Sequence, residues 1–490
     1  MHASPRMRWS TFFWVGLAVM VSAFWLWINF CRFPDTSWND IRLVPTFMAA
    51  MGEPVYTLPG TGVITTWMYG PVPLWLWSPA VLGTNPVSAL LIADGLNLTI
   101  TLIAISLTCF CWPITGTTRT QRWLTLAAVI ALWPDHTFRF LQADNPAIAL
   151  GLLANLWLVT GNPAGGGRRA WLAAFATALA LGCKQNTLGL LVAQLLWLVW
   201  ASGWKTSALH LGRTFACGVV VAAIAIGQFG LHGLWFGTVG IAANLPMFED
   251  GGGRLRELAP ILVVQWGLPL LAVCVFRGKL RSPHHALSLP LLAWFTSLPL
   301  GIFGLLSTGG STNNLQGFHY VVIPLTLIFM AWAAERFRQF YLPLMSIAVA
   351  SVICARIVTA DRAPMHPATQ NVEQAIEIQA SLPHQIWLPW NPLVTYFGDH
   401  RFYHAEDGLY VRFITDHPVS VTQARAHLPE HFHAMAFPNA KMQWGGRRQT
   451  SPVRPFDVAI RFVGDPPMDA TESLRRIFQS YRFIFNLHRQ

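Results

Sequence analysis

Long apolar runs separated by short polar loops occupy the chain from its start to about residue 358. The first run, 11–31, is about twenty residues long, and no A-x-A cleavage site follows it, so it predicts an uncleaved span and not a signal peptide. About ten further runs are long enough to cross or nearly cross a bilayer. They cover 87–112, 123–134, 146–161, 170–184, 185–200, 214–233, 260–276, 286–307, 320–335 and 341–358. This pattern predicts a polytopic α-helical membrane protein with about eleven transmembrane helices.

One further apolar segment, 72–83, has a different pattern. Prolines interrupt or flank it at Pro71, Pro73, Pro79 and Pro86. Since proline removes a backbone donor and limits helix length, we predict a short, partly inserted helix here.

Basic residues concentrate in every second loop. These loops hold Arg119, Arg122, Arg168, Arg169, Lys205, Arg213, Arg277, Lys279, Arg281, Arg336 and Arg338. The alternate loops hold Asp35, Asp40, Glu53, Asp135, Asp144, Glu249, Asp250 and Glu257. Since basic loops stay on the cytoplasmic side, we predict a cytoplasmic N-terminus and an external first loop, defined here as residues 32–86.

The polar tail predicts a second domain. We divide the chain into a transmembrane domain, 1–358, and an extracytoplasmic soluble α/β domain, 359–490. Asn391-Pro392 is typical of a helix cap followed by proline in the first turn, and a further helix is predicted near 419–427. Strands are predicted at 385–388, 401–403, 432–437, 456–462 and 481–487.

Composition supports a membrane protein and argues against a nucleic-acid partner. The chain is 53% apolar and 11% charged, against roughly 25% charged in an ordinary soluble protein. The formal net charge of +11 lies in short loops between apolar runs. All seven cysteines lie in or beside apolar runs, so neither a disulfide framework nor a cysteine metal site is predicted.

The first loop contains an unusual order of features. Asp40 is followed by Gly52-Glu53-Pro54-Val55-Tyr56, and then by Tyr69-Gly70-Pro71-Val72-Pro73 at the entry to the next apolar segment. This order resembles the first external loop of the GT-C membrane glycosyltransferases, the superfamily of protein O-mannosyltransferases and the aminoarabinose transferases of lipid A. The resemblance implies a GT-C fold and a sugar donor linked to a polyprenyl phosphate.

In that superfamily the aspartate of this loop acts on the sugar acceptor. The resemblance therefore implies a catalytic role for Asp40, with Asp35 as its nearest competitor; taken alone, Asp40 could also be a solvated loop residue. Better-known members often carry an Asp-Glu pair here, whereas this chain has no adjacent glutamate. The choice of base and the need for a divalent cation therefore stay open. No other cofactor and no metal ligands are predicted.

Asp144 is the third candidate for a catalytic role. It lies at the outer start of a predicted span, directly before Asn145-Pro146, where members of the superfamily commonly have an aspartate. The alternative is a helix N-cap whose carboxylate accepts backbone N–H bonds.

Lys184-Gln185 lies between two apolar runs, at the predicted external boundary. Because an ionisable residue within a membrane is expensive, it marks a functional site by default; the alternative is a lysine that snorkels from an outer turn. The resemblance implies that Lys184 faces the lipid-linked phosphate, and Arg42 and Arg139 are predicted to assist it.

Small and polar residues form the last external loop before a span, Gly309-Gly310-Ser311-Thr312-Asn313-Asn314, which His319 follows. Asparagine side chains can bond sugar hydroxyls, although glycine-rich turns are often merely flexible. The loop also resembles a late G-x-x-x-N segment of bacterial superfamily members. The predicted substrate-binding residues are Tyr56, Tyr69, Gln185, Asn313, Asn314 and His319.

The combined interpretation is an inverting glycosyltransferase of the outer face of an inner membrane. It would move a sugar from a polyprenyl-phosphate donor to a hydroxyl of a glycan, lipid or protein acceptor, with membrane lipids around it. A transporter or flippase of lipid-linked saccharide is the alternative from another class, but no inverted repeat is visible. A lipid-linked saccharide ligase or polymerase on the same architecture is the other alternative.

Overall fold

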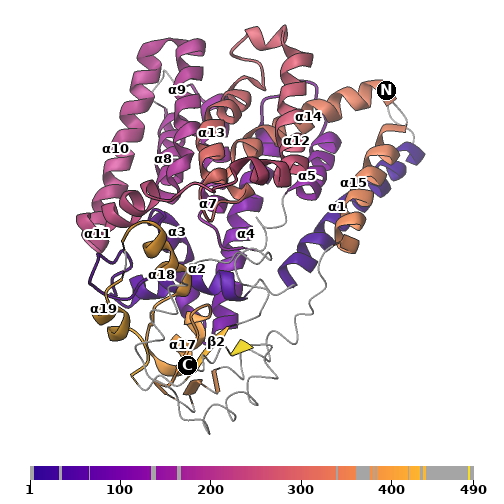
Figure 1. The fold of residues 1–490 in the computed structure, drawn as a ribbon. Helices are drawn as coiled ribbons and strands as arrows, with labels where there is room; N and C mark the ends of the chain where they lie inside the picture. Colours follow the sequence, from indigo (N-terminus) through magenta and orange to yellow (C-terminus); the bar gives the residue numbers. More distant parts are fainter. Residues whose placement is uncertain are drawn as a thin grey trace.

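The computed structural model is mostly helical (Figure 1). It describes residues 5–31, 36–65, 67–133, 140–162, 167–337, 340–359, 376–377, 379–380, 383–417, 419–430, 434–437 and 484–485.

Each predicted span coincides with a helix. These helices are α1 (Pro5–Cys31), α4 (Pro86–Cys111), α5 (Arg119–Leu132), α7 (Asp144–Thr160), α8 (Arg168–Cys183), α9 (Leu188–Ser202), α10 (Trp204–Phe229), α12 (Gly251–Phe276), α13 (Ser288–Leu306), α14 (Gly317–Phe337) and α15 (Tyr341–Thr359). Seven of the described helices are long and apolar enough to cross a membrane by themselves. The predicted polytopic helical membrane protein is confirmed.

One helix, α7, lies in the interior of the bundle, whereas α1, α10 and α12 present apolar faces outward. Nearly all residues of α7 are buried, and it packs between α8 and α4. By contrast, Phe12 on α1, Phe215 on α10 and Val263 on α12 are 73%, 71% and 70% exposed. Outward apolar faces of this kind suit surrounding lipid. A second group, α1, α5 and α15, packs along one side of the bundle (Figure 1).

The first loop is more regular than the sequence indicated. Asp40 lies within a helix, α2 (Thr36–Ala50), so its assignment to a polar loop was wrong. The proline-flanked segment forms α3 (Val72–Trp77) and the 3-10 turn η1 (Ser78–Leu82), which confirms the predicted short helix.

The tail combines short helices and strands. A three-stranded sheet has the order β1 (Ile386–Trp387), β2 (Ala434–Phe437) and β3 (Ile484–Phe485), with β2 parallel to β1 and antiparallel to β3. Its helices are α17 (Pro392–Asp399), α18 (Glu406–Ile414) and α19 (Val421–Ala426).

Two details of the tail differ from the predictions. Residues 401–403 form no strand, and they pair with none of the described strands of the sheet. The helix α18 was not predicted. The predicted strand at 456–462 lies outside the described residues. The domain division at residue 358 stays a prediction.

Candidate functional site

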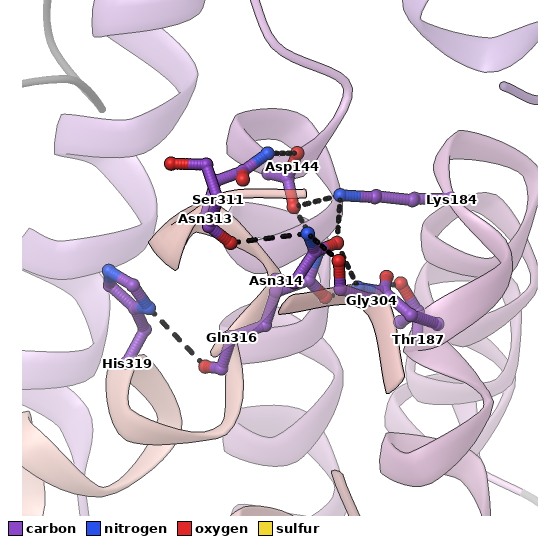
Figure 2. Close-up of polar contacts among 10 residues, drawn as sticks. Asp144, Lys184, Thr187, Gly304, Ser311, Asn313, Asn314, Gln316 and His319 are labelled. Carbon is purple, nitrogen blue, oxygen red and sulfur yellow. Dashed lines mark hydrogen bonds and ion pairs between the residues drawn. The ribbon is translucent and has the colours of Figure 1, made fainter. Parts of the chain in front are cut away.

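Asp144 and Lys184 form a buried ion pair at one end of the bundle (Figure 2). Asp144 is the first residue of α7, and Lys184 follows the last residue of α8 in an extended conformation. Their Oδ1 and Nζ atoms lie 2.7 Å apart, and the residues are 2% and 6% exposed. Exclusion of water strengthens this interaction relative to a surface pair, but it also requires other polar groups to complete the solvation of both charges.

Amide side chains of residues 313–316, from the last external loop and the segment that follows it, complete that solvation. Asn313 donates to Asp144 Oδ2 at 2.9 Å, and Gln316 donates to Oδ1 at 2.7 Å. Lys184 Nζ donates to Asn314 Oδ1 at 3.0 Å. We call these five residues the Asp144–Lys184 network. The N-cap alternative for Asp144 is wrong, since Ala143 occupies that position and makes no side-chain cap, and side chains satisfy the Asp144 carboxylate.

The glycines before these amides serve the packing of the loop itself. A Cβ at Gly310 would lie 1.9 Å from the backbone oxygen of Gly304 in α13. Asn314, in the 3-10 turn η5 (Thr312–Asn314), also donates to Gly304 O at 3.1 Å. The loop is therefore held against α13, which orients Asn313 and Asn314 toward the ion pair (Figure 2).

Tyr69 connects the first loop to this network. The Arg42 guanidinium carbon lies 5.1 Å from the centre of the Tyr69 ring, and Lys184 Nζ lies 5.6 Å from it. The neighbouring Gly70 donates to Cys183 O at 3.2 Å, and a Cβ at Gly70 would lie 2.0 Å from Gly182 O. Only glycine permits this close approach between the first loop and the end of α8. Two predicted phosphate ligands, Arg42 and Lys184, thus share one aromatic neighbour.

Tyr56 and Gln185 connect the first loop to the π-helical turn near Tyr69 through hydrogen bonds and packing. The Tyr56 hydroxyl donates to Tyr69 O at 2.8 Å, and its ring packs against Gly237 in the π-helical turn η3 (Phe236–Ile241). Gln185 donates to the backbone oxygens of Met68 and Thr238. The structure therefore gives both residues positioning contacts; their predicted contact with substrate stays a prediction.

Asp40 connects the first loop to the tail. It is 1% exposed, and its Oδ1 accepts a 2.6 Å bond from the backbone N–H of Leu393, while Oδ2 lies 3.4 Å from the Asn391 amide nitrogen. Asn391 does precede α17 as predicted, but its side chain caps nothing; Asp40 supplies the capping oxygen from another part of the chain. Burial raises the pKa of Asp40, and its two hydrogen bonds oppose that shift. It is not the solvated aspartate of the alternative interpretation.

Further side chains bond the tail to the first loop. His404 Nδ1 accepts from Ile64 N at 2.9 Å, and Gln423 bonds the backbone of Gly60 and Thr61 at 2.9 Å each. Arg412 donates to the backbone oxygen of Thr57. Together with Asp40, these contacts define what we call the tail–loop interface.

The remaining predicted residues are Asp35, Arg139 and His319. Asp35 and Arg139 lie outside the described residues. His319 packs edge-on against the Trp133 ring with centroids 4.6 Å apart, and its Nδ1 lies 3.3 Å from Gln316 O.

Gln316 itself was not predicted, although it is an amide at the start of an otherwise apolar span. Within the described ranges, no group of three or more His, Cys, Asp or Glu residues could hold a metal ion.

Several solved structures resemble this chain in fold. ArnT from Cupriavidus metallidurans bound to undecaprenyl phosphate matches with a TM-score of 0.53 and 11% identity, over 83% of this chain and 89% of that chain. This chain shares its fold. The archaeal oligosaccharyltransferase AglB from Archaeoglobus fulgidus, in complex with an inhibitory peptide and a dolichol-phosphate, matches with a TM-score of 0.52 and 10% identity, over 90% and 70% of the two chains.

The Archaeoglobus fulgidus oligosaccharyltransferase complex with Zn and sulfate also matches, with a TM-score of 0.50 and 10% identity over 88% of this chain and 68% of that chain. The GT-C fold implied by the first loop is thereby confirmed. No protein-family model and no curated protein sequence matches the chain.

Proposed function

We propose that this protein is an inverting glycosyltransferase that uses a sugar linked to a polyprenyl phosphate. The observation that carries the proposal is the pair of cations around Tyr69. Arg42 is 6% exposed, and its Nη1 has no hydrogen-bond partner among the described residues. A buried donor without an acceptor is costly, and a phosphate oxygen is a suitable acceptor for a guanidinium.

The charges favour a monoanionic ligand group. Asp144 and Lys184 compensate each other, so Arg42 contributes a positive charge that no ion pair with a described residue neutralises. The phosphodiester of a polyprenyl-phosphate sugar carries one negative charge and gains a second when the sugar leaves. Fixed positive groups therefore stabilise the departing phosphate more than the bound donor, which is the requirement for lowering the barrier.

The reaction also needs a base for the acceptor. The acceptor oxygen attacks the anomeric carbon, the bond from that carbon to the phosphate oxygen breaks, and a carboxylate takes the hydroxyl proton. Asp40, Asp35 and Asp144 are the candidates predicted from the sequence. The oxygens of Asp40 and Asp144 are hydrogen-bonded within the protein, as described above.

Binding of the donor lipid tests the proposal directly. Undecaprenyl phosphate should raise the melting temperature of the purified wild-type protein, because a ligand that binds only the folded state stabilises it. Lys184→Met should weaken this binding about ten- to a hundredfold, since a hydrogen bond to a charged group is worth roughly 1.5–3 kcal/mol. Each variant is compared with its own melt without lipid.

Lys205→Met provides the matched control, because Lys205 is exposed at the start of α10. It should respond to the lipid as the wild-type protein does. Equal stabilisation of wild-type and Lys184→Met protein would remove Lys184 as a phosphate ligand. If undecaprenyl phosphate does not stabilise the wild-type protein, the donor class is wrong.

We also propose that the N-terminus is cytoplasmic and that the tail lies outside the cytoplasm. The alternation of basic and acidic loops supports this orientation. A reporter fused after Gln490 should be active only in the external compartment. Activity of that reporter in the cytoplasm would place the proposed site on the other face of the membrane.

A further inference from the structure

Asp407 is a buried acid with no assigned partner. It lies near the start of α18 and is 4% exposed. Its carboxylate makes no hydrogen bond or ion pair that the described part of the structure records, whereas Asp40 and Asp144 are both bonded. Asp399, the other buried acid of the described tail, accepts from the Tyr403 hydroxyl at 2.6 Å. Asp407 therefore retains oxygens that are free to bond a ligand.

Backbone contacts hold α18 against the first loop. Ala405 N donates to Ile64 O at 2.9 Å, and a Cβ at Gly408 would lie 2.6 Å from Thr65 O. These contacts lie on both sides of Asp407 in the sequence, so they hold its main chain against the first loop. Both α2, the helix that carries Arg42, and α18 contribute to the tail–loop interface, through Asp40 and Arg412.

Asp407 and Arg42 influence each other electrostatically without forming an ion pair. Burial raises the pKa of Asp407 to about 6, and the Arg42 guanidinium acts against that shift. Arg42 in turn keeps an unpartnered Nη1 among the described residues. Two buried, opposite charges that form no ion pair with each other can bind different groups of the bound substrates. The guanidinium can bind a phosphate, and the carboxylate can bind a hydroxyl.

We propose that Asp407, from the tail, accepts the proton of the acceptor hydroxyl during sugar transfer. The inference rests on the proposed function. The acceptor oxygen forms its bond to the anomeric carbon, and the bond from that carbon to phosphate breaks. The hydroxyl proton passes to the Asp407 carboxylate, and the polyprenyl phosphate leaves with both electrons of the broken bond. One negative charge disappears from Asp407 and one appears on the phosphate, so the charge is conserved.

The geometry favours Asp407 over Asp40 for this step. Asp40 Oδ1 accepts the N–H of Leu393, so a new hydrogen bond at that oxygen would compete with the first turn of α17. Asp407 has no such bond to give up. A base whose pKa lies near the operating pH is both ionised and able to take a proton.

Asp407→Asn tests the assignment through separate readouts of donor binding and transfer. The variant should gain the same thermal stabilisation from undecaprenyl phosphate as the wild-type protein, while the rate of sugar transfer from a polyprenyl-phosphate sugar falls about 100- to 10,000-fold. Asp416→Asn is the matched control: Asp416 is an exposed acid just after α18, and its substitution should change neither quantity. The melt without lipid reports whether each variant is folded.

Each other outcome overturns the assignment. Near wild-type transfer by Asp407→Asn, particularly together with a large loss in Asp40→Asn, would return the role to Asp40. Loss of lipid stabilisation in Asp407→Asn would show that the residue acts by positioning Arg42. If the lipid does not stabilise the wild-type protein, both the proposed function and the role of Asp407 are wrong. If the lipid stabilises the wild-type protein and the Asp407→Asn variant still transfers sugar, only the assignment of Asp407 is wrong.

Discussion

The Asp144–Lys184 network and the tail–loop interface both use buried polar side chains, but they satisfy them differently. In the network, a carboxylate and an ammonium meet directly, and amide side chains of residues 313–316 surround them. At the interface, Asp40, His404 and Gln423 bond backbone groups of a distant segment. The network therefore depends on an ion pair, whereas at the interface single side chains form hydrogen bonds with main-chain groups.

This difference predicts different responses to substitution. Removal of one partner from a buried ion pair leaves an uncompensated charge. When a neutral side chain is removed from the interface, the backbone groups that it bonded can form hydrogen bonds with water at the edge of the contact. The predictions below test that contrast.

The largest effect on stability should come from Lys184→Met. It leaves Asp144 buried with only amide partners, and breaking a buried pair in this way typically costs about 3–5 kcal/mol. The double variant Lys184→Met, Asp144→Asn should recover much of the loss, because the orphaned charge is gone. Thermal melts of the single and double variants, beside exposed Lys205→Met, measure the effect. Unchanged stability of the single variant would instead support the snorkelling interpretation of Lys184.

Acidification should weaken the tail–loop interface through His404. Burial lowers the pKa of His404 to about 4, with its bond to the Gln423 backbone oxygen acting in the opposite direction. Between pH 4 and 6.5 the unfolded chain therefore binds a proton that the folded chain does not, so stability falls as the pH is lowered through this window, by up to roughly 3 kcal/mol.

His404→Gln separates this effect from general acid sensitivity. Glutamine keeps a donor and an acceptor but does not titrate in this range. The variant should lose less stability than the wild-type protein between pH 6.5 and 4, measured by melts and by hydrogen exchange of residues 57–65. Parallel pH curves for the two proteins would show that His404 does not control the interface.

Asp40→Ala should have an intermediate effect. Loss of the oxygen that caps α17 typically costs about 1–2 kcal/mol. Asp40→Asn keeps a carbonyl oxygen for the Leu393 N–H and should lose less. If alanine and asparagine are equally harmful, the charge of Asp40 stabilises the protein and the capping bond does not.

Gln423→Met should have the smallest effect. It removes two neutral hydrogen bonds to Gly60 and Thr61 while keeping a chain of similar length, at a net cost of about 1 kcal/mol. Protease sensitivity of residues 57–65 offers a local readout besides the melt. A loss as large as that of Lys184→Met would contradict the contrast between the two regions.

The sequence by itself determined the helical framework but not all of its ends, since α10 begins at Trp204 and α12 at Gly251, ahead of the predicted starts at 214 and 260. Hydropathy reports the transfer of local segments into lipid, so every predicted span coincides with a helix. Gly70 and the amides at Asn313 and Asn314 were also visible as motifs, because their residue types are unusual beside apolar runs. Lys184 stood out for the same reason, since an ionisable residue there is expensive.

The tertiary structure alone decided the partners of these residues. Lys184 meets Asp144 across 40 residues and Asn313 meets Asp144 across 169. Asp40 caps a helix that begins about 350 residues later, through the N–H of Leu393, and a backbone N–H carries no side-chain signature that a sequence pattern could reveal. The isolation of Asp407 was equally invisible, because the absence of a partner depends on everything packed around the side chain. The free energy of inserting a segment into lipid depends on the residues of that segment alone. Whether a buried polar group has a hydrogen-bond partner depends on the complete folded structure.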